Sequence, residues 1–221
     1  MNTPRSREGN LFRYIVYFIG YLMVAGVVKL VTLNSPLHVW DLILFGVISL
    51  MILLFYIYRF NREQRYFDHN FASVSWLGNF GLIVGLTLVV TALRISVAYL
   101  QATGKLQLYN FQTAYLKHES VTTYWFLLVA IGIILPILQE FLTSGFLFNY
   151  AFRRNTMVVA ICGIIFSGVL FSILNWQFSF SLLVVNAIFG CLFAWSYLYT
   201  QTIWMPIYLA VVNGVILLIM T

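Results

Sequence analysis

Four charged side chains lie within long apolar stretches of the sequence: Lys29, Asp41, Arg94 and Glu140. A charge at the centre of a membrane span costs about 2.5 kcal/mol or more, so such residues are usually paired or functional. Glu140 lies near the middle of its apolar stretch, and no basic residue lies at the same depth in the membrane. Because removal from water disfavours a charged carboxylate, we expect a neutral, hydrogen-bonded carboxyl, with Asn213 and Asn186 as its neighbours by depth in the membrane.

The other three charges belong to the ends of apolar stretches. Lys29 and Asp41 are close to the ends of the first two stretches, and Arg94 lies about a turn or two inside the third. We therefore predict that Lys29, Asp41 and Arg94 form a neutralising ion cluster that holds helices together. An ion pathway is the alternative, but no chain of proton-relay groups is visible in the sequence.

Three motifs follow one another in the second half of the sequence, with polar groups inside apolar stretches. They are ILPILQEFLTSGFLFNYAFRR (134–154), GVLFSILNW (168–176) and YLYTQTIWMPIYLAVVNG (197–214). In order and spacing they resemble the motifs of the CAAX-processing and bacteriocin-processing family of intramembrane proteases, also called the CPBP or Abi family. The resemblance covers about residues 121–220.

The resemblance implies a degenerate catalytic site. Family members are thought to hydrolyse peptide bonds with a water that glutamate and histidine activate, while a second histidine and an asparagine hold a metal or the oxyanion. Here Gln139 replaces the first glutamate, Asn175 the first histidine and Ala210 the second. The degenerate site positions are Gln139, Glu140, Ser144, Asn175, Ala210, Asn213 and Gly214.

These replacements predict a loss of catalysis. Ser144 stands where the family has arginine, and Gly214 where it has asparagine or aspartate, although Asn213 is adjacent. An amide cannot serve as a general base, and losing several cooperating groups leaves little more than binding. Counting the helical rise places Asn175 well above Glu140, unless its helix begins outside the bilayer. The expected binding residues are Glu140, Asn175, Asn186 and Asn213.

We therefore predict a catalytically inactive scaffold or regulator that binds another membrane or cell-envelope protein or peptide. Bacteriocin immunity and control of cell-wall enzymes are the roles that the resemblance suggests. An intramembrane endopeptidase with a reduced glutamate-based site is the alternative, followed by a small transporter or a simple membrane anchor. No cofactor or metal is expected, because His38, His69 and His118 are scattered along the chain.

The elements that must position these residues are membrane-spanning helices. The chain is 62% hydrophobic and only 8% charged, so lipid must be its solvent. We predict an all-α, polytopic transmembrane helix bundle of about seven spans. Residues 1–120 would form three spans and a polar connector, and residues 121–221 a four-helix CPBP/Abi-like core. The predicted spans are 11–33, 38–59, 74–100, 121–150, 156–175, 179–199 and 203–220.

The basic residues predict the orientation, because lysine and arginine accumulate in short cytoplasmic loops. A seven-span arrangement puts eight arginines on one side: Arg5, Arg7, Arg13, Arg59, Arg62, Arg65, Arg153 and Arg154. We expect a multi-pass protein of the bacterial cytoplasmic membrane, with its N-terminus in the cytoplasm and its C-terminus outside. The net charge of +6 then favours contact with anionic lipid head groups, and no nucleic-acid partner is expected.

Overall fold

The computed structural model describes all residues except 1–6, 34–36, 64–79, 118–119, 153–155 and 176–178. Within the described ranges the regular structure is entirely helical. The elements are α1 (Arg7–Leu33), α2 (Val39–Glu63), α3 (Phe80–Ala102), α4 (Asn110–Lys117), α5 (Val121–Val129), the π-helical η2 (Ala130–Ile134), α6 (Leu135–Glu140), the π-helical η3 (Phe141–Phe146), α7 (Leu147–Tyr150), α8 (Met157–Leu174), α9 (Phe180–Thr200) and α10 (Trp204–Ile219).

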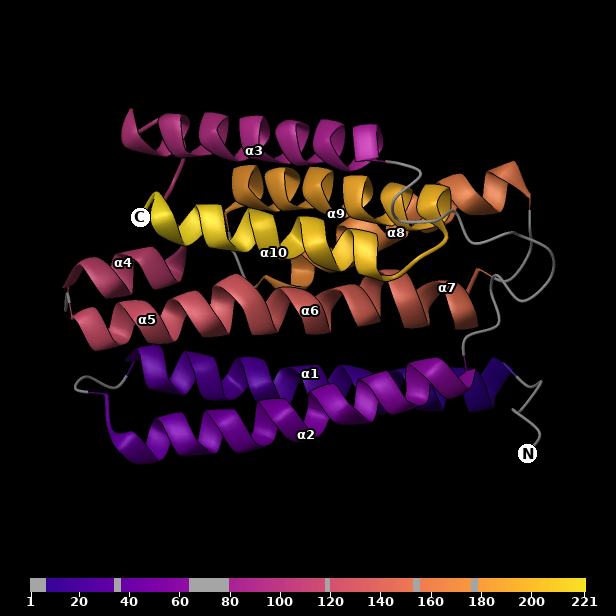
Figure 1. Cartoon of the computed structure of the whole chain (residues 1–221), viewed down its shortest axis with the longest axis horizontal. Coiled ribbons are helices and arrows are strands. Elements are labelled where there is room, and N and C mark those ends of the chain that lie inside the picture. Colours follow the sequence, from indigo (N-terminus) through magenta and orange to yellow (C-terminus); the bar gives the residue numbers. More distant parts are fainter. Residues whose placement is uncertain (1–6, 34–36, 64–79, 118–119, 153–155, 176–178) are drawn as a thin grey trace.

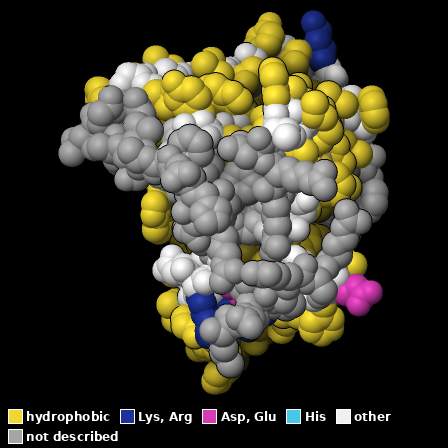
Figure 2. Space-filling model, turned by 90° about the vertical axis from the view of Figure 1, so that its right-hand side faces the viewer, with side chains coloured by type: hydrophobic (Ala, Val, Ile, Leu, Met, Phe, Trp, Pro, Cys, Tyr) yellow, Lys and Arg dark blue, Asp and Glu magenta, His cyan; other side chains and the backbone are white. Residues whose placement is uncertain are grey.

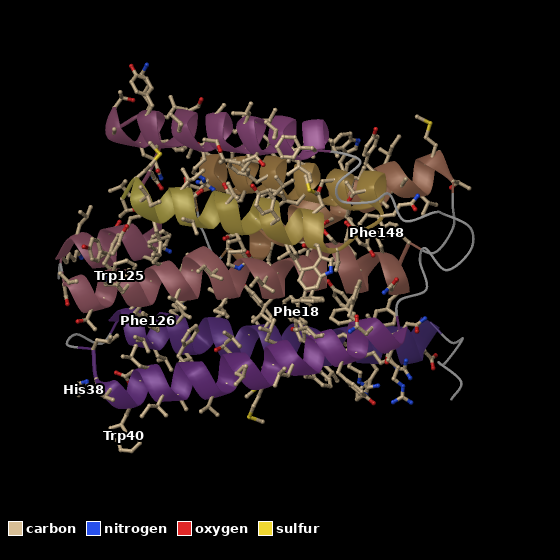
Figure 3. All side chains as sticks on the ribbon, in the orientation of Figure 1. Phe18, His38, Trp40, Trp125, Phe126 and Phe148 are labelled. Atoms are coloured by element: carbon tan, nitrogen blue, oxygen red, sulfur yellow. The ribbon has the colours of Figure 1, made fainter. Side chains whose placement is uncertain are left out.

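The long helices run side by side in layers (Figure 1). In one layer α1 packs on α2, and in the next the segments α5 to α7 form one almost continuous helix. Beyond them α8 packs on α9, while α10 contacts α3, α9, η2 and α6. Phe126 on α5 joins the first two layers, because its ring meets Phe45 of α2 edge-on with centroids 5.2 Å apart (Figure 3).

Six helical segments are long and apolar enough to cross a membrane, and α10 is a shorter apolar helix of the same kind. Their outer faces carry large hydrophobic side chains such as Trp40, Phe80 and Phe180, each at least 72% exposed. Seen from the end where α1 begins, hydrophobic side chains also occupy most of the described periphery (Figure 2). The predicted polytopic bundle of about seven spans is therefore confirmed, although the first residues of predicted span 74–100 lie outside the described ranges.

The fourth span is interrupted by two π-helical turns, η2 and η3, which flank α6. Pro136 near the start of α6 has no amide hydrogen to donate to the preceding turn, which helps to explain the wider winding there. Such π-helical turns occur frequently at functional sites because they change the direction of neighbouring side chains. Here they bracket Gln139 and Glu140.

A charged cluster ties three helices together at the end of the bundle where α1 begins. The Glu63 carboxylate lies 3.1 Å from an Arg59 nitrogen and 3.3 Å from an Arg13 nitrogen, and its side chain is only 3% exposed. It also accepts hydrogen bonds from the hydroxyls of Tyr17 and Tyr150. A carboxylate at a helix C-terminus opposes the helix dipole, so the two arginines compensate a position that would otherwise be unfavourable.

Candidate functional site

A cavity of about 430 Å³ lies between the helices and is lined by residues from α1, α3, α4, η2, α6, α8, α9 and α10. This volume falls within the roughly 300–1,000 Å³ that is typical of small-molecule sites. Most of its wall is apolar, including Leu22, Ile131, Leu135, Phe171 and Leu217. The cavity therefore offers an apolar interior with a limited number of polar contacts.

Most of the degenerate site positions line this cavity. Gln139 projects from α6, and Asn175 lies at the C-terminal end of α8. The helical-rise count had left the place of Asn175 open, and the structure puts it in the cavity. The other site positions in the lining are Ala210, Asn213 and Gly214 of α10.

Glu140 and Ser144 lie outside the cavity lining, although the sequence marked Glu140 as a binding residue. Adjacent residues of a helix point about 100° apart, so α6 can turn only one of its two last side chains to the cavity, and that is Gln139. Glu140 is fully buried elsewhere, with Ser144 Oγ donating to its Oε2 at 2.6 Å. Its Oε1 has no hydrogen-bond partner within the described part of the chain.

Asn186 and Asn213, the neighbours expected for Glu140 by depth, form their hydrogen bonds with other residues. Asn213 Oδ1 instead accepts from Arg94 Nε at 2.8 Å, and Asn186 Oδ1 accepts from Tyr109 Oη at 3.1 Å. Arg94 also reaches Tyr109 Oη at 3.1 Å through a terminal nitrogen. A guanidinium carries several donors in a fixed fork, so Arg94 can bond to Asn213 and Tyr109 at once, and Tyr109 in turn bonds to Asn186.

The predicted ion cluster is divided in the structure. Asp41 lies in the first turn of α2, accepts the amide hydrogen of His38 at 3.0 Å and sits 3.8 Å from its imidazole. An acidic residue in a first helical turn satisfies free amide groups and faces the positive end of the dipole, which explains this local pairing. Lys29 and Arg94 line the cavity together instead.

The two amides at degenerate positions are held in local hydrogen bonds. Gln139 Nε2 donates to Tyr21 Oη at 3.0 Å, and Tyr21 in turn donates to the Leu174 carbonyl at 3.2 Å. Asn175 Nδ2 donates to the Phe171 carbonyl at 2.8 Å. This arrangement connects α1 and α8 to α6 around the cavity, and its members are neutral.

Gly214 permits a close contact that a side chain would obstruct. A Cβ atom at this position would lie 2.8 Å from the Gly132 carbonyl oxygen and 3.1 Å from the Gly132 Cα. Both are backbone atoms of η2, which cannot move aside as a flexible side chain can. An asparagine at position 214 would therefore require α10 to shift away from η2.

The geometry defines a polytopic helical membrane protein with a cavity among its spans. Residues 121–216 match the family model described as type II CAAX prenyl endopeptidase Rce1-like. The predicted family resemblance is thus confirmed for this part of the chain, which extends from α5 into α10. No curated protein matches the chain, and no solved structure matches it either.

The cavity also contains residues that the sequence interpretation did not assign to a site. Tyr21 and Gly26 come from α1, and Tyr109, Asn110 and Phe111 come from α4 or the residue before it. All five precede the family-matched segment. The signal for α4 was weak, because an eight-residue helix with little apolar character looks like part of a polar connector.

Within the described ranges, His, Cys, Asp and Glu side chains do not gather in a group of three or more. His38 is near Asp41 at the start of α2 (Figure 3), whereas His69 and His118 lie outside the described residues. Among the described residues, the cavity lining contains no histidine, cysteine or carboxylate. Its polar groups can accept and donate hydrogen bonds, but they do not resemble a metal-ligand set.

Proposed function

We propose that this chain is a catalytically inactive Rce1-like membrane protein that binds another membrane or membrane-anchored protein or peptide in its cavity. The observation that carries the proposal is the convergence of Gln139, Asn175, Ala210 and Gly214 on one cavity. These are the positions at which the family resemblance expects catalytic groups. Their position on a single cavity supports a binding site, and their side chains lack the groups that catalysis requires.

Peptide hydrolysis needs a base to activate water and a donor to stabilise the oxyanion. The amides of Gln139 and Asn175 can donate hydrogen bonds but cannot remove a proton from water. Ala210 has no functional group, and Gly214 is held against the backbone of Gly132. The residues of the cavity thus support recognition and not proton transfer.

An endopeptidase with a reduced site is the alternative, and it would depend on Glu140. That carboxyl bonds to Ser144 and lies outside the cavity lining, so a ligand in the cavity does not face it directly. A nearby catalytic partner would also be needed to polarise the peptide carbonyl. The structure therefore supports the binding role more strongly.

The binding role is tested by filling the cavity. Gly26 lines it, and a Cβ added there meets no atom within 4 Å, so Gly26→Leu should place its side chain in the cavity without a backbone clash. Gly46→Leu in α2 is the matched control, because Gly46 is equally uncrowded but lies outside the lining. We expect cross-linking and affinity purification from native membranes to recover a protein or peptide partner with wild type and G46L. Recovery with G26L at the wild-type level would contradict the proposal.

We further propose a location in the bacterial cytoplasmic membrane, with the N-terminus and residues 60–73 in the cytoplasm and residues 101–120 and the C-terminus outside. The support is the asymmetric distribution of arginines. Of these, Arg5, Arg65, Arg153 and Arg154 lie outside the described residues. Nucleic acid is not proposed as a partner.

Single cysteines test this orientation. In a chain whose Cys162 and Cys191 are replaced by serine, Ser6→Cys should be protected from an impermeant thiol reagent in intact cells, and Thr221→Cys should react. Labelling of both positions from the same side would rule out a seven-span arrangement.

A further inference from the structure

The cavity contains two cations that no acid of the described residues balances. Lys29 and Arg94 are both in its lining, and none of the described lining residues is an aspartate or glutamate. Elsewhere in the described part of the chain, Asp41 pairs with His38 and Glu63 pairs with Arg13 and Arg59. Neither cavity cation forms a salt bridge with a described residue.

Arg94 in particular is an unusual residue for the interior of a membrane protein. Its side chain is only 2% exposed, and its contacts are neutral: Asn213, Tyr109 and the face of Phe189, 4.6 Å from the guanidinium carbon. These contacts orient the guanidinium but supply no negative charge. A buried cation is costly unless an anion compensates it, so the cavity is suited to a ligand that brings one.

Asn186, a further polar residue of the lining, has an unsatisfied donor among the described residues. Asn186 is 2% exposed and its Oδ1 is occupied by Tyr109, whereas its Nδ2 has no hydrogen-bond partner within the described ranges. An unsatisfied buried donor costs about 1–3 kcal/mol, and an acceptor oxygen would satisfy it. This observation is independent of the two cations and points to the same ligand chemistry.

The positions of the cations along their helices match the shape of an amphiphile. Lys29 is exposed and lies four residues before the end of α1, about 6 Å along the helix, whereas Arg94 is about 12 Å from the end of α3. The interfacial region, where lipid head groups lie, is within reach of Lys29. The rest of the lining, including Leu22, Leu135 and Phe171, is apolar.

We propose that, in the absence of a protein or peptide partner, the cavity binds a single-chain anionic lipid of the surrounding membrane. Its phosphate or carboxylate head group lies between Lys29 and Arg94, and its hydrocarbon chain follows the apolar wall. Both cations precede residues 121–216, so the positive charge of the anion site comes from outside the family-matched segment, whereas Asn186 lies within it. The inference goes beyond the proposed function, because it concerns a lipid and the residues that hold its charge.

The test uses the full-length protein in nanodiscs of zwitterionic phosphatidylcholine, with dodecyl phosphate as the anionic probe and dodecanol as its neutral counterpart. Native mass spectrometry over a range of probe concentrations gives the affinity of each. We expect dodecyl phosphate to bind more tightly than dodecanol, and added salt to weaken its binding because ions screen the attraction. Equal affinity for the two probes would overturn the proposal.

Two matched pairs of variants locate the binding. Lys29→Gln should lower the affinity for dodecyl phosphate about fivefold, because one lysine near a charged head group contributes about 1 kcal/mol. Lys105→Gln removes the same charge at the same end of the bundle, outside the lining, and should leave affinity unchanged. Gly26→Leu should abolish probe binding, whereas Gly46→Leu should preserve it. An equal effect of K29Q and K105Q would contradict the assignment.

Lipids released from protein purified from its own membrane identify the source of the anion. A fatty acid, lysophospholipid or other single-chain anion in wild type, reduced in K29Q, supports the proposal, and neutral lipid alone contradicts it. The outcome is separable from that of the proposed function. If G26L loses its protein partner while dodecyl phosphate and dodecanol bind alike, the binding role stands and the lipid anion site does not.

Discussion

The two regions of the molecule that concentrate positive charge differ in whether the chain supplies the opposite charge. In the Glu63 cluster, one carboxylate meets Arg13 and Arg59 and two tyrosine hydroxyls. In the cavity, Arg94 contacts an amide, a hydroxyl and a ring, Lys29 is in the same lining, and no described lining residue has a carboxylate. A charge balanced within the chain fastens helices to one another, whereas an unbalanced charge in a cavity is available to a ligand.

The largest loss of stability is expected in the Glu63 cluster, where the chain itself supplies the opposite charge. Glu63→Ala should lower the free energy of unfolding by about 3 kcal/mol, because removing one partner leaves two arginines near each other without their anion. The arginine side chains are 26% and 35% exposed, so solvent limits the loss. Glu8→Ala, at an exposed position of α1, is the control and should change stability little. Denaturation in detergent micelles measures both, and equal losses would show that the cluster has no special role.

A buried carboxyl that belongs to neither region provides the next test. Glu140→Leu should lower the free energy of unfolding by about 2 kcal/mol, because it removes the acceptor of the buried Ser144 hydroxyl. Glu140→Gln keeps an acceptor and nearly the same shape, so stability and partner recovery should survive it. If E140Q abolished a cellular phenotype while folding and partner binding remained intact, a glutamate-based catalytic site would have to replace the binding role.

A smaller effect is expected for the buried cavity cation. Arg94→Met should lower the free energy of unfolding by only about 1 kcal/mol. It removes the hydrogen bonds to Asn213 and Tyr109, but it also removes a buried charge that no described acid compensates, and the second change partly offsets the first. Dodecyl phosphate should raise the thermal midpoint of wild type and leave that of R94M nearly unchanged. A loss of stability in R94M as large as that in E63A would mean that Arg94 is structural in the same sense as the Glu63 cluster.

The smallest expected effect is a coupling between Asp41 and Arg94. The structure gives these residues different partners, so the stability changes of Asp41→Ala and Arg94→Met should add within about 0.5 kcal/mol in the double mutant. A double-mutant cycle in micelles measures the difference. Strong non-additivity would restore the ion cluster that the sequence suggested and weaken the contrast between the two regions.

The sequence by itself determined the number and approximate limits of the spans. Helices such as α8 and α9 match predicted spans 156–175 and 179–199 closely, because a lipid-exposed helix must satisfy its backbone internally and show an apolar surface over its whole length. The motifs around Gln139 and Asn175 also predicted which family the second half resembles. Local composition and spacing are sufficient for both conclusions.

Only the tertiary structure decided which polar groups meet. Depth along a helix does not fix the direction of a side chain, so the sequence could not choose between Gln139 and Glu140 at the cavity. Nor could it separate Asp41 from Arg94, because at similar depth the choice of partner depends on which helices are neighbours. The contribution of α4 and of Tyr21 to the cavity is likewise a consequence of packing between segments far apart in the chain. Helix rotation and neighbour choice are set by interhelical contacts over the whole bundle, and no single stretch of sequence contains them.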